Sequence, residues 1–353
     1  MLDYFIHFLF IALTALCIRT ILPLQKKWAG LFHLIDKPCN RKIHSRNIPT
    51  SGGLSIYLSL LPLLIFLCFQ ERIYIGIFIS ASILLVLGIS DDIKPIPARY
   101  KLVAQSLACI VTIYFGTEIT WISNPFGYPI YLNYFGKILS FFWLLGIINA
   151  MNLIDGIDGL ASGISTIACI AMAIIGFKLN NTTSLLLSLC LGSCCLLFYR
   201  YNRHPAQIFL GDSGSTFIGF MLACISINGV LKSTLSLSFL SPLLILCLPL
   251  SDTTWTIIRR ITKKQKLFIA DKEHIHHTLM NKGLHSPLIT LILCSFSAAT
   301  SGLAIMIHLP TTFLPYTSIL FVIICILQIN FILSKLRNHR IKTKYLSNER
   351  PQV

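Results

Sequence analysis

Eleven long apolar runs divide this chain, and they constrain its fold more than any other feature of the sequence. The runs cover roughly residues 3–24, 49–69, 73–90, 102–117, 135–153, 159–177, 183–199, 207–229, 235–257, 287–308 and 313–334. A helix needs about 20 apolar residues to cross a bilayer. Only 12% of the side chains are charged, whereas a soluble domain carries about 25%. The sequence therefore excludes a soluble enzyme and predicts an all-α polytopic integral membrane protein with about eleven transmembrane helices.

The basic residues are distributed unevenly among the loops between these runs. With the loop after the first run placed in the cytoplasm, 25 of the 29 Lys and Arg residues fall on the cytoplasmic side. Such an excess marks the cytoplasmic loops of membrane proteins, where basic side chains meet anionic lipid. We therefore expect the N-terminus outside and the C-terminus inside, with anionic lipid as a partner. Because this asymmetry accounts for the net charge of +16, we expect no nucleic acid partner.

The outer segment 118–132, EITWISNPFGYPIYL, differs from the other loops. It has β-branched and aromatic residues on both sides of Asn-Pro-Phe-Gly. That pattern favours a short β-hairpin, with a plain loop as the alternative.

Acidic residues gather at the inner ends of the spans, where six of them lie: Asp91, Asp92, Asp155, Asp158, Asp212 and Asp252. Carboxylates at membrane depth are costly and mark functional sites. Since they come from separate regions of the chain but lie at one level, we expect a single site at the cytoplasmic membrane surface.

The first motif, Gly88-Ile-Ser-Asp91-Asp92, ends the third run. Adjacent residues on a helix diverge by about 100°, so one carboxylate can face a substrate while the other orients it or binds a metal ion. Negative charge at a helix C-terminus opposes the helix dipole, which argues against a purely structural role.

The second motif places an oxygen-bearing side chain at every third residue, at Asn149, Asn152, Asp155 and Asp158. On a helix, neighbours in this series share a face, and we expect that arrangement here. Carboxylate and amide oxygens are hard ligands that suit Mg²⁺, with Mn²⁺ as the alternative.

The third motif, Phe209-Leu-Gly211-Asp212-Ser-Gly214-Ser, opens the eighth run. Glycine lets the backbone approach a ligand closely, and the N–H groups at a helix start favour an anion. Asp212 is a candidate metal ligand, with a simple helix cap as the alternative.

Two inner segments carry histidines and basic residues. The longest inner loop holds a histidine cluster that fits phosphate recognition better than zinc binding: His274, His276 and His277. The segment before the second run suggests a phosphate-facing loop, with positive-inside charge as the alternative. Its basic residues include Lys42, His44 and Arg46.

As an ordered set, these motifs resemble those of the polyprenyl-phosphate N-acetylhexosamine-1-phosphate transferases. That family includes the bacterial enzymes that start O-antigen, common-antigen and teichoic-acid synthesis, and the peptidoglycan translocase. The resemblance covers Arg41 to about His277 and consists of R-K-x-H…P-x-x-G-G, DD, N-A-x-N-x-x-D-G-x-D-G-L, F-x-G-D-x-G-S and H-I-H-H. The H-I-H-H form is similar to that of the N-acetylglucosamine branch. The continuation Asp91-Asp92-Ile-Lys-Pro departs from the D-D-x-x-D form common in the family.

The resemblance implies a role for each matched residue. Asp212 would bind the metal ion with help from Asn152, and the catalytic residues would be Asp91, Asp92 and Asp155. Phe209 would stack on uracil, with Asp158 nearby. The other substrate-binding residues would be Asn149, His274, His276, His277, Lys42, His44 and Arg46.

The reaction implied by the resemblance is attack by undecaprenyl phosphate on the β-phosphorus of a UDP-N-acetylhexosamine, with Mg²⁺ as cofactor and UMP as product. UDP-N-acetylglucosamine is the favoured donor. A phosphate monoester has its second pKa near 6, so the attacking phosphate needs no strong base. We therefore expect Asp91 and Asp92 to position the substrate and the metal, with a covalent aspartyl-phosphate route left open.

The resemblance also implies a setting for this reaction. It would be the first membrane step of a cell-surface polysaccharide such as O-antigen, at the cytoplasmic face of the bacterial inner membrane. Residues 1–335 would form a single transmembrane catalytic domain, residues 336–353 a basic cytoplasmic tail, and two copies could form a homodimer.

Three alternatives remain on the sequence alone. The donor could be another UDP-N-acetylhexosamine or UDP-MurNAc-pentapeptide. In a different class, the chain could be a membrane transporter with intramembrane carboxylates. Transporter sites lie near the bilayer midplane and often within internal repeats, whereas these carboxylates lie at the inner edge and no repeat is visible in the sequence.

Overall fold

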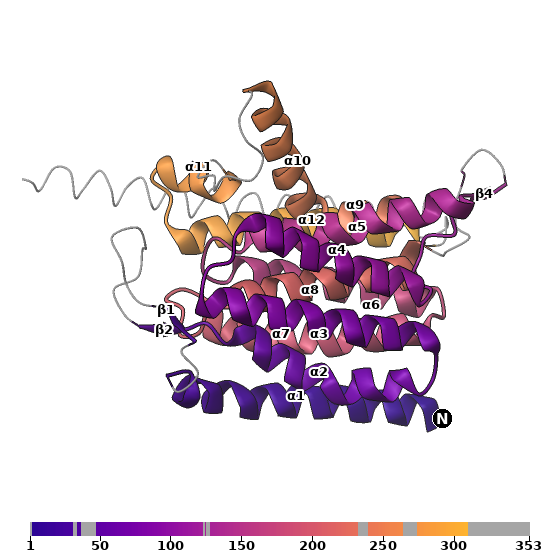
Figure 1. Cartoon of the computed structure of the whole chain (residues 1–353), viewed down its shortest axis with the longest axis horizontal. Helices are drawn as coiled ribbons and strands as arrows, with labels where there is room; N and C mark the ends of the chain where they lie inside the picture. The colour runs from indigo at the N-terminus through magenta and orange to yellow at the C-terminus, as the bar shows by residue number, and fades with distance from the viewer. Residues whose placement is uncertain are drawn as a thin grey trace, which may run out of the picture.

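The computed structural model of the chain describes residues 2–30, 34–36, 47–122, 124, 128–231, 239–263 and 274–309. In this part the protein is a bundle of helices that lie side by side (Figure 1). The helices are α1 (Leu2–Trp28), α2 (Gly52–Cys68), α3 (Arg72–Ile93), α4 (Ala98–Tyr114), α5 (Asn133–Ile154), α6 (Leu160–Lys178), α7 (Thr182–Asn202), α8 (Gly211–Ile225), α9 (Leu240–Ile245), α10 (Cys247–Thr262), α11 (Ile275–Asn281) and α12 (Ser286–Ile307). A π-helical turn, Ser226–Leu231, continues α8.

Among the described residues, six helices are long and apolar enough to cross a membrane: α1, α3, α5, α6, α7 and α12. Helix α2 is apolar but has only 17 residues. The prediction of an all-α polytopic membrane protein is therefore confirmed at this level. The eleventh expected run, 313–334, and the tail 336–353 lie outside the described residues.

The ninth expected run, 235–257, is not one continuous span. Its described part is divided between α9 and α10 at Leu246, and α10 leaves the bundle steeply (Figure 1). The physical reason is Pro249 in the first turn of α10: it has no N–H to donate to the carbonyl of Ile245, so a helix cannot continue unbroken through Leu246. The exposed side of α10 nevertheless carries large apolar side chains, with Trp255 64% and Ile261 63% exposed.

Two short antiparallel hairpins lie at opposite ends of the bundle (Figure 1). The predicted hairpin is confirmed as β3 (Trp121–Ile122) and β4 (Ile130–Tyr131), with Trp121 opposite Tyr131. At the other end, near α11, β1 (Ile35–Asp36) pairs with β2 (Ile48–Pro49), which the sequence did not predict. The N-terminus lies at the same end of the bundle as β4 (Figure 1).

Helix α8 is the centre of the bundle, because every residue from Ser213 to Ile225 is buried. Its first turn packs backbone to backbone against two neighbouring helices. A Cβ on Gly88 of α3 would collide with the backbone of Ser213, and one on Gly53 of α2 with the backbone of Gly214. Glycine at these positions lets the start of α8 lie deep between α2 and α3.

We predict that Gly88→Ala destabilises the fold by about 1–3 kcal/mol, because the added methyl group forces α3 and α8 apart. Thermal unfolding in detergent measures the effect. Gly146→Ala is the matched control, since a Cβ on Gly146 in α5 meets nothing within 4 Å. An unfolding midpoint for Gly88→Ala equal to that of the control would contradict the close packing.

Candidate active site

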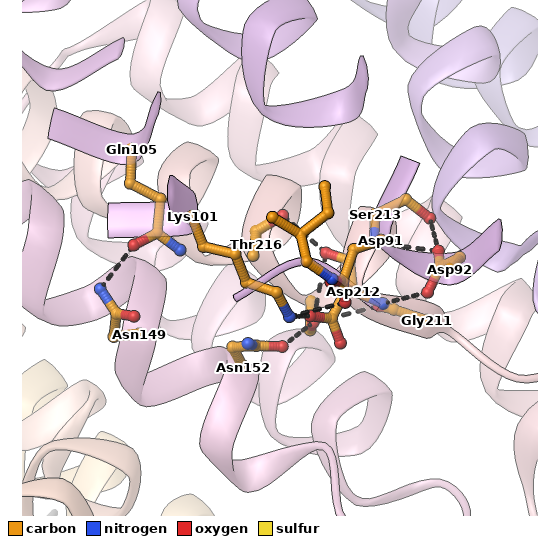
Figure 2. Close-up of polar contacts among 12 residues, drawn as sticks. Asp91, Asp92, Lys101, Gln105, Asn149, Asn152, Gly211, Asp212, Ser213 and Thr216 are labelled. Carbon is orange, nitrogen blue, oxygen red and sulfur yellow. Dashed lines mark hydrogen bonds and ion pairs between the residues drawn. The ribbon is translucent and has the colours of Figure 1, made fainter. Parts of the chain in front are cut away.

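The C-terminal end of α3 and the N-terminal ends of α4 and α8 meet around one ammonium group. Lys101 Nζ lies 2.6 Å from Asp91 Oδ2 and 2.6 Å from Asp212 Oδ2 (Figure 2). Asp91 Oδ1 also accepts a hydrogen bond of 2.7 Å from the backbone N–H of Ile96, in the turn between α3 and α4. Lys101 thus joins two carboxylates that lie far apart in the sequence.

Asp92 faces away from this lysine and binds the start of α8. Its Oδ1 accepts the N–H of Asp212 at 2.8 Å, and its Oδ2 accepts the N–H and the hydroxyl of Ser213 at 3.2 and 2.7 Å (Figure 2). Gly211 allows this contact with a φ of +75°, in a region that favours glycine. The two neighbouring carboxylates therefore diverge, as their spacing predicts, and Asp92 satisfies N–H groups that the helix leaves unpaired.

Asn152 and Asn149 lie on α5 but in different surroundings. Asn152 Oδ1 accepts a hydrogen bond of 2.7 Å from Ser215 in α8, which brings it beside Asp212 (Figure 2). Asn149 instead donates to Gln105 of α4 at 3.0 Å. The structure brings Asn152 to the carboxylate cluster, whereas Asn149 lies one turn deeper in the bundle.

Asp155 and Asp158 do not continue the helical face of the two asparagines. The expectation of one shared helix face is wrong, because α5 ends at Ile154 and both carboxylates lie in the following loop. Asp158 Oδ2 accepts hydrogen bonds from His204 Nδ1 at 2.9 Å and from the N–H of Ala206 at 3.2 Å. These contacts join the loop to the segment after α7.

Asp155 lies among other carboxylates. Burial, together with the negative charges of Asp212, Asp92 and Asp158, raises the pKa of Asp155 well above its ordinary value. The ionised carboxylate of Asp155 therefore lowers the free energy of unfolding.

An open cavity of about 1280 Å³ lies beside these groups. Seven of the residues predicted from the sequence line it: Asp92, Asn152, Asp155, Asp158, Phe209, Asp212 and His277. Lys101 and Asp91 are not part of its lining, so Asp212 lies between them and the cavity.

The histidine cluster lies partly beneath the cavity wall. His274 and His276 are buried, with 5% and 1% of their surface exposed. Burial and the neighbouring His277 and His274 lower the pKa of His276 to about 4, so this ring is neutral at pH 7. Lys42, His44 and Arg46 lie outside the described residues.

Sequence reasoning missed Lys101 and His204, which lie at the site, and Gln105, which binds Asn149 one turn deeper in the bundle. Lys101 was counted only as a positive-inside charge, and Gln105 and His204 were not singled out. The available signal was spacing, since Lys101 and Gln105 lie one turn apart at the start of the helix that follows Asp91-Asp92.

The oxygen groups around Asp212 fit a hard divalent cation. Asp91 and Asp212 already share one cation, the Lys101 ammonium, and Asn152 adds an amide oxygen nearby. No three His, Cys, Asp or Glu side chains of the described residues converge as a complete metal site. Mg²⁺ needs no such cage, because it is usually bound by one or two carboxylates, water and substrate phosphates.

The long apolar helices, with clustered carboxylates beside an open cavity at one end of the bundle, define a multi-pass membrane protein with a candidate active site. The chain belongs to glycosyl transferase family 4, whose model matches residues 74–230. This confirms the family resemblance of the motifs.

Two relatives are similar over most of their length. One is the "probable undecaprenyl-phosphate N-acetylglucosaminyl 1-phosphate transferase" of Bacillus subtilis, 36% identical over 93% of this chain and 92% of the relative. The other is the "undecaprenyl-phosphate alpha-N-acetylglucosaminyl 1-phosphate transferase" of Escherichia coli K12, 30% identical over 80% of this chain and 78% of the relative.

We predict that Asp155→Asn stabilises the Mg²⁺-free protein while abolishing its activity. The raised pKa means that the folded state resists ionisation, so the carboxyl of Asp155 reduces stability as pH rises above its ordinary pKa of about 3.9. Unfolding midpoints measured between about pH 5 and pH 8 should therefore fall more steeply for the natural protein than for Asp155→Asn.

Asp158→Asn is the control for this prediction. Its carboxylate has two hydrogen-bond donors, so its loss should lower stability. If Asp155→Asn were also less stable than the natural protein at pH 8, the electrostatic account of Asp155 would be wrong.

Proposed function

We propose that this protein transfers N-acetylglucosamine 1-phosphate from UDP-N-acetylglucosamine to undecaprenyl phosphate and releases UMP. The observation that carries the proposal is the Asp91–Lys101–Asp212 cluster at the edge of a large polar cavity. Transfer between two phosphate groups needs positioning and charge neutralisation more than covalent chemistry by the protein. The printed names of the two relatives support this choice of acceptor and transferred group.

The geometry suggests a separate approach for each substrate. The water-soluble donor fits the open cavity, which Phe209, Asp158 and His277 line. We place the lipid phosphate on the opposite side of Asp212, beside Lys101 of α4 and Asp91 of α3. The attacking oxygen and the β-phosphorus would then meet beside Asp212.

Individual side chains then take distinct roles in the proposed reaction. The Lys101 ammonium neutralises the attacking phosphate, and Asp91 orients that ammonium through its 2.6 Å contact. Asp92 is a positioning residue, because all three of its hydrogen bonds fix the start of α8 and hence Asp212. Asp212 and Asn152 would hold Mg²⁺, which neutralises charge on the diphosphate when bound.

The topology and setting form part of the same proposal. We place the N-terminus outside and the cavity at the cytoplasmic face of the bacterial inner membrane. Single cysteines at Asn47 and Tyr134, in a cysteine-free background, test this orientation. Asn47 should react with an impermeant thiol reagent only after permeabilisation, and Tyr134 in intact cells.

The decisive experiment follows the β-phosphorus of the donor. With UDP-N-acetylglucosamine labelled at that atom, undecaprenyl phosphate and Mg²⁺, we predict that the label moves to the lipid and unlabelled UMP appears. One phosphoanhydride replaces another, so the equilibrium constant lies within a few tenfold steps of unity and added UMP should regenerate labelled donor. Label retained in UDP would contradict the proposal. Parallel reactions with other UDP-N-acetylhexosamines and UDP-MurNAc-pentapeptide identify the preferred donor.

A second prediction concerns Lys101. Lys101→Gln should reduce kcat/KM for the lipid phosphate by at least about a hundredfold, because the proposed contact of this half-buried cation with the transferring phosphates is lost. Initial rates at saturating UDP-N-acetylglucosamine measure it. Lys94→Gln, at an exposed lysine just beyond α3, is the control and should retain natural activity. Equal activity of the two variants would exclude the proposed role of Lys101.

A further inference from the structure

We propose that Asp252 is a positioning residue that holds the histidine-bearing helix α11 against the active-site loop. Asp252 belongs to α10, the helix that leaves the bundle, and none of the roles above uses it. The inference rests on the proposed function, because its readout is the handling of the sugar nucleotide.

The carboxylate of Asp252 is buried and engaged on both oxygens. Only 5% of its side-chain surface and 6% of that of His274 is exposed. Its Oδ2 lies 3.0 Å from His274 Nδ1, and its Oδ1 accepts the N–H of Ile275 at 2.9 Å. The second bond pairs an N–H group at the start of α11, which the helix itself leaves without a partner.

These two bonds determine where α11 begins. His274 is the N-cap residue of α11, and its own side chain makes no capping hydrogen bond. The acceptor comes instead from α10, so one carboxylate sets both the ring orientation of His274 and the start of the short helix. A seven-residue helix has little stability of its own, and its position depends on such contacts.

Helix α11 carries this constraint to the candidate active site. The rings of His274 and His276 are stacked, with centroids 5.9 Å apart. His276 abuts the loop after α5, since a Cβ on Gly156 would collide with the His276 ring. Gly156 lies between Asp155 and Ile157 and lines the cavity, as does His277 of α11. Asp252 therefore acts on the cavity wall through three histidines.

The buried His276 supports a functional reason for this arrangement. Both of its ring nitrogens are buried and have no hydrogen-bond partner among the described residues. Buried polar atoms without partners are costly, and a well-packed structural residue would avoid them. The position of His276 is thus maintained by the residues packed around it rather than by its own hydrogen bonds. One of these residues is His274, whose ring stacks on His276 and is itself bound by the carboxylate of Asp252.

The test compares Asp252→Asn, His274→Ala and the double variant in the full-length protein, purified in detergent with Mg²⁺. Thr253→Ala is the matched control, because among the described residues its hydroxyl donates only to the carbonyl of Pro249 in the same helix. Apparent KM values are measured for UDP-N-acetylglucosamine and for undecaprenyl phosphate. Size-exclusion profiles and unfolding midpoints establish that each variant is folded.

We expect Asp252→Asn to raise the KM for UDP-N-acetylglucosamine at least about tenfold and to change the KM for the lipid less than about twofold. The double variant should be no worse than the more severe single variant, because the two residues act as one unit. The proposal would be overturned if Asp252→Asn left both KM values unchanged, or if it raised both to a similar extent. Additive effects of the two substitutions in the double variant would also overturn it.

A second pair of variants covers the case in which Asp252→Asn does not fold. His274→Gln keeps an N–H donor for Asp252, whereas His274→Ala removes it. Higher sugar-nucleotide affinity for His274→Gln than for His274→Ala supports the proposal, and equal affinity overturns it. An inactive natural protein would instead contradict the proposed function itself, so the two failures are distinguishable.

Discussion

The ammonium of Lys101, shared between Asp91 and Asp212 at 2.6 Å each, is the interaction on which this end of the bundle depends. Without a cation between them, the half-buried carboxylates of α3 and α8 would repel each other. Removing the shared cation therefore destabilises this end of the bundle, although less than for a fully buried pair, because water screens the remaining charges. In the proposed reaction the same cation also meets the lipid phosphate, so one side chain serves both stability and function.

Close backbone packing makes that electrostatic arrangement possible. Gly53 and Gly88 let the first turn of α8 lie between α2 and α3, and Asp92 then binds the N–H groups of that turn. Because α8 is buried from Ser213 to Ile225, the helix that carries Asp212 at its start has little freedom to move. The position of one carboxylate is thus determined by glycine contacts, a capping carboxylate and an ion pair acting together.

The sequence predicted which residues come together at the site better than how they are arranged. Motif spacing identified Asp212, Asn152 and the divergence of Asp91 from Asp92, because adjacent helical residues diverge in any helix. It failed for Asp155 and Asp158, since periodicity does not reveal that α5 ends at Ile154. Lys101 was missed for another reason. A lysine at the inner end of a span is ordinarily explained by the positive-inside pattern, and only its contacts distinguish it from Lys94.

The break at Leu246 had no decisive signal in the sequence either. Pro249 prevents a helix from continuing unbroken past Ile245, but Pro23 and Pro62 lie inside the unbroken helices α1 and α2. Because of the break, α10 leaves the bundle and carries Asp252 to α11, whose histidines then lie beside the loop of Asp155 and Asp158. His277 and Met280 of α11 line the cavity, so a helix that departs from the bundle positions part of the cavity wall. In the proposed reaction this wall lies on the donor's side of Asp212, opposite Lys101, so the water-soluble donor and the lipid would approach from different sides.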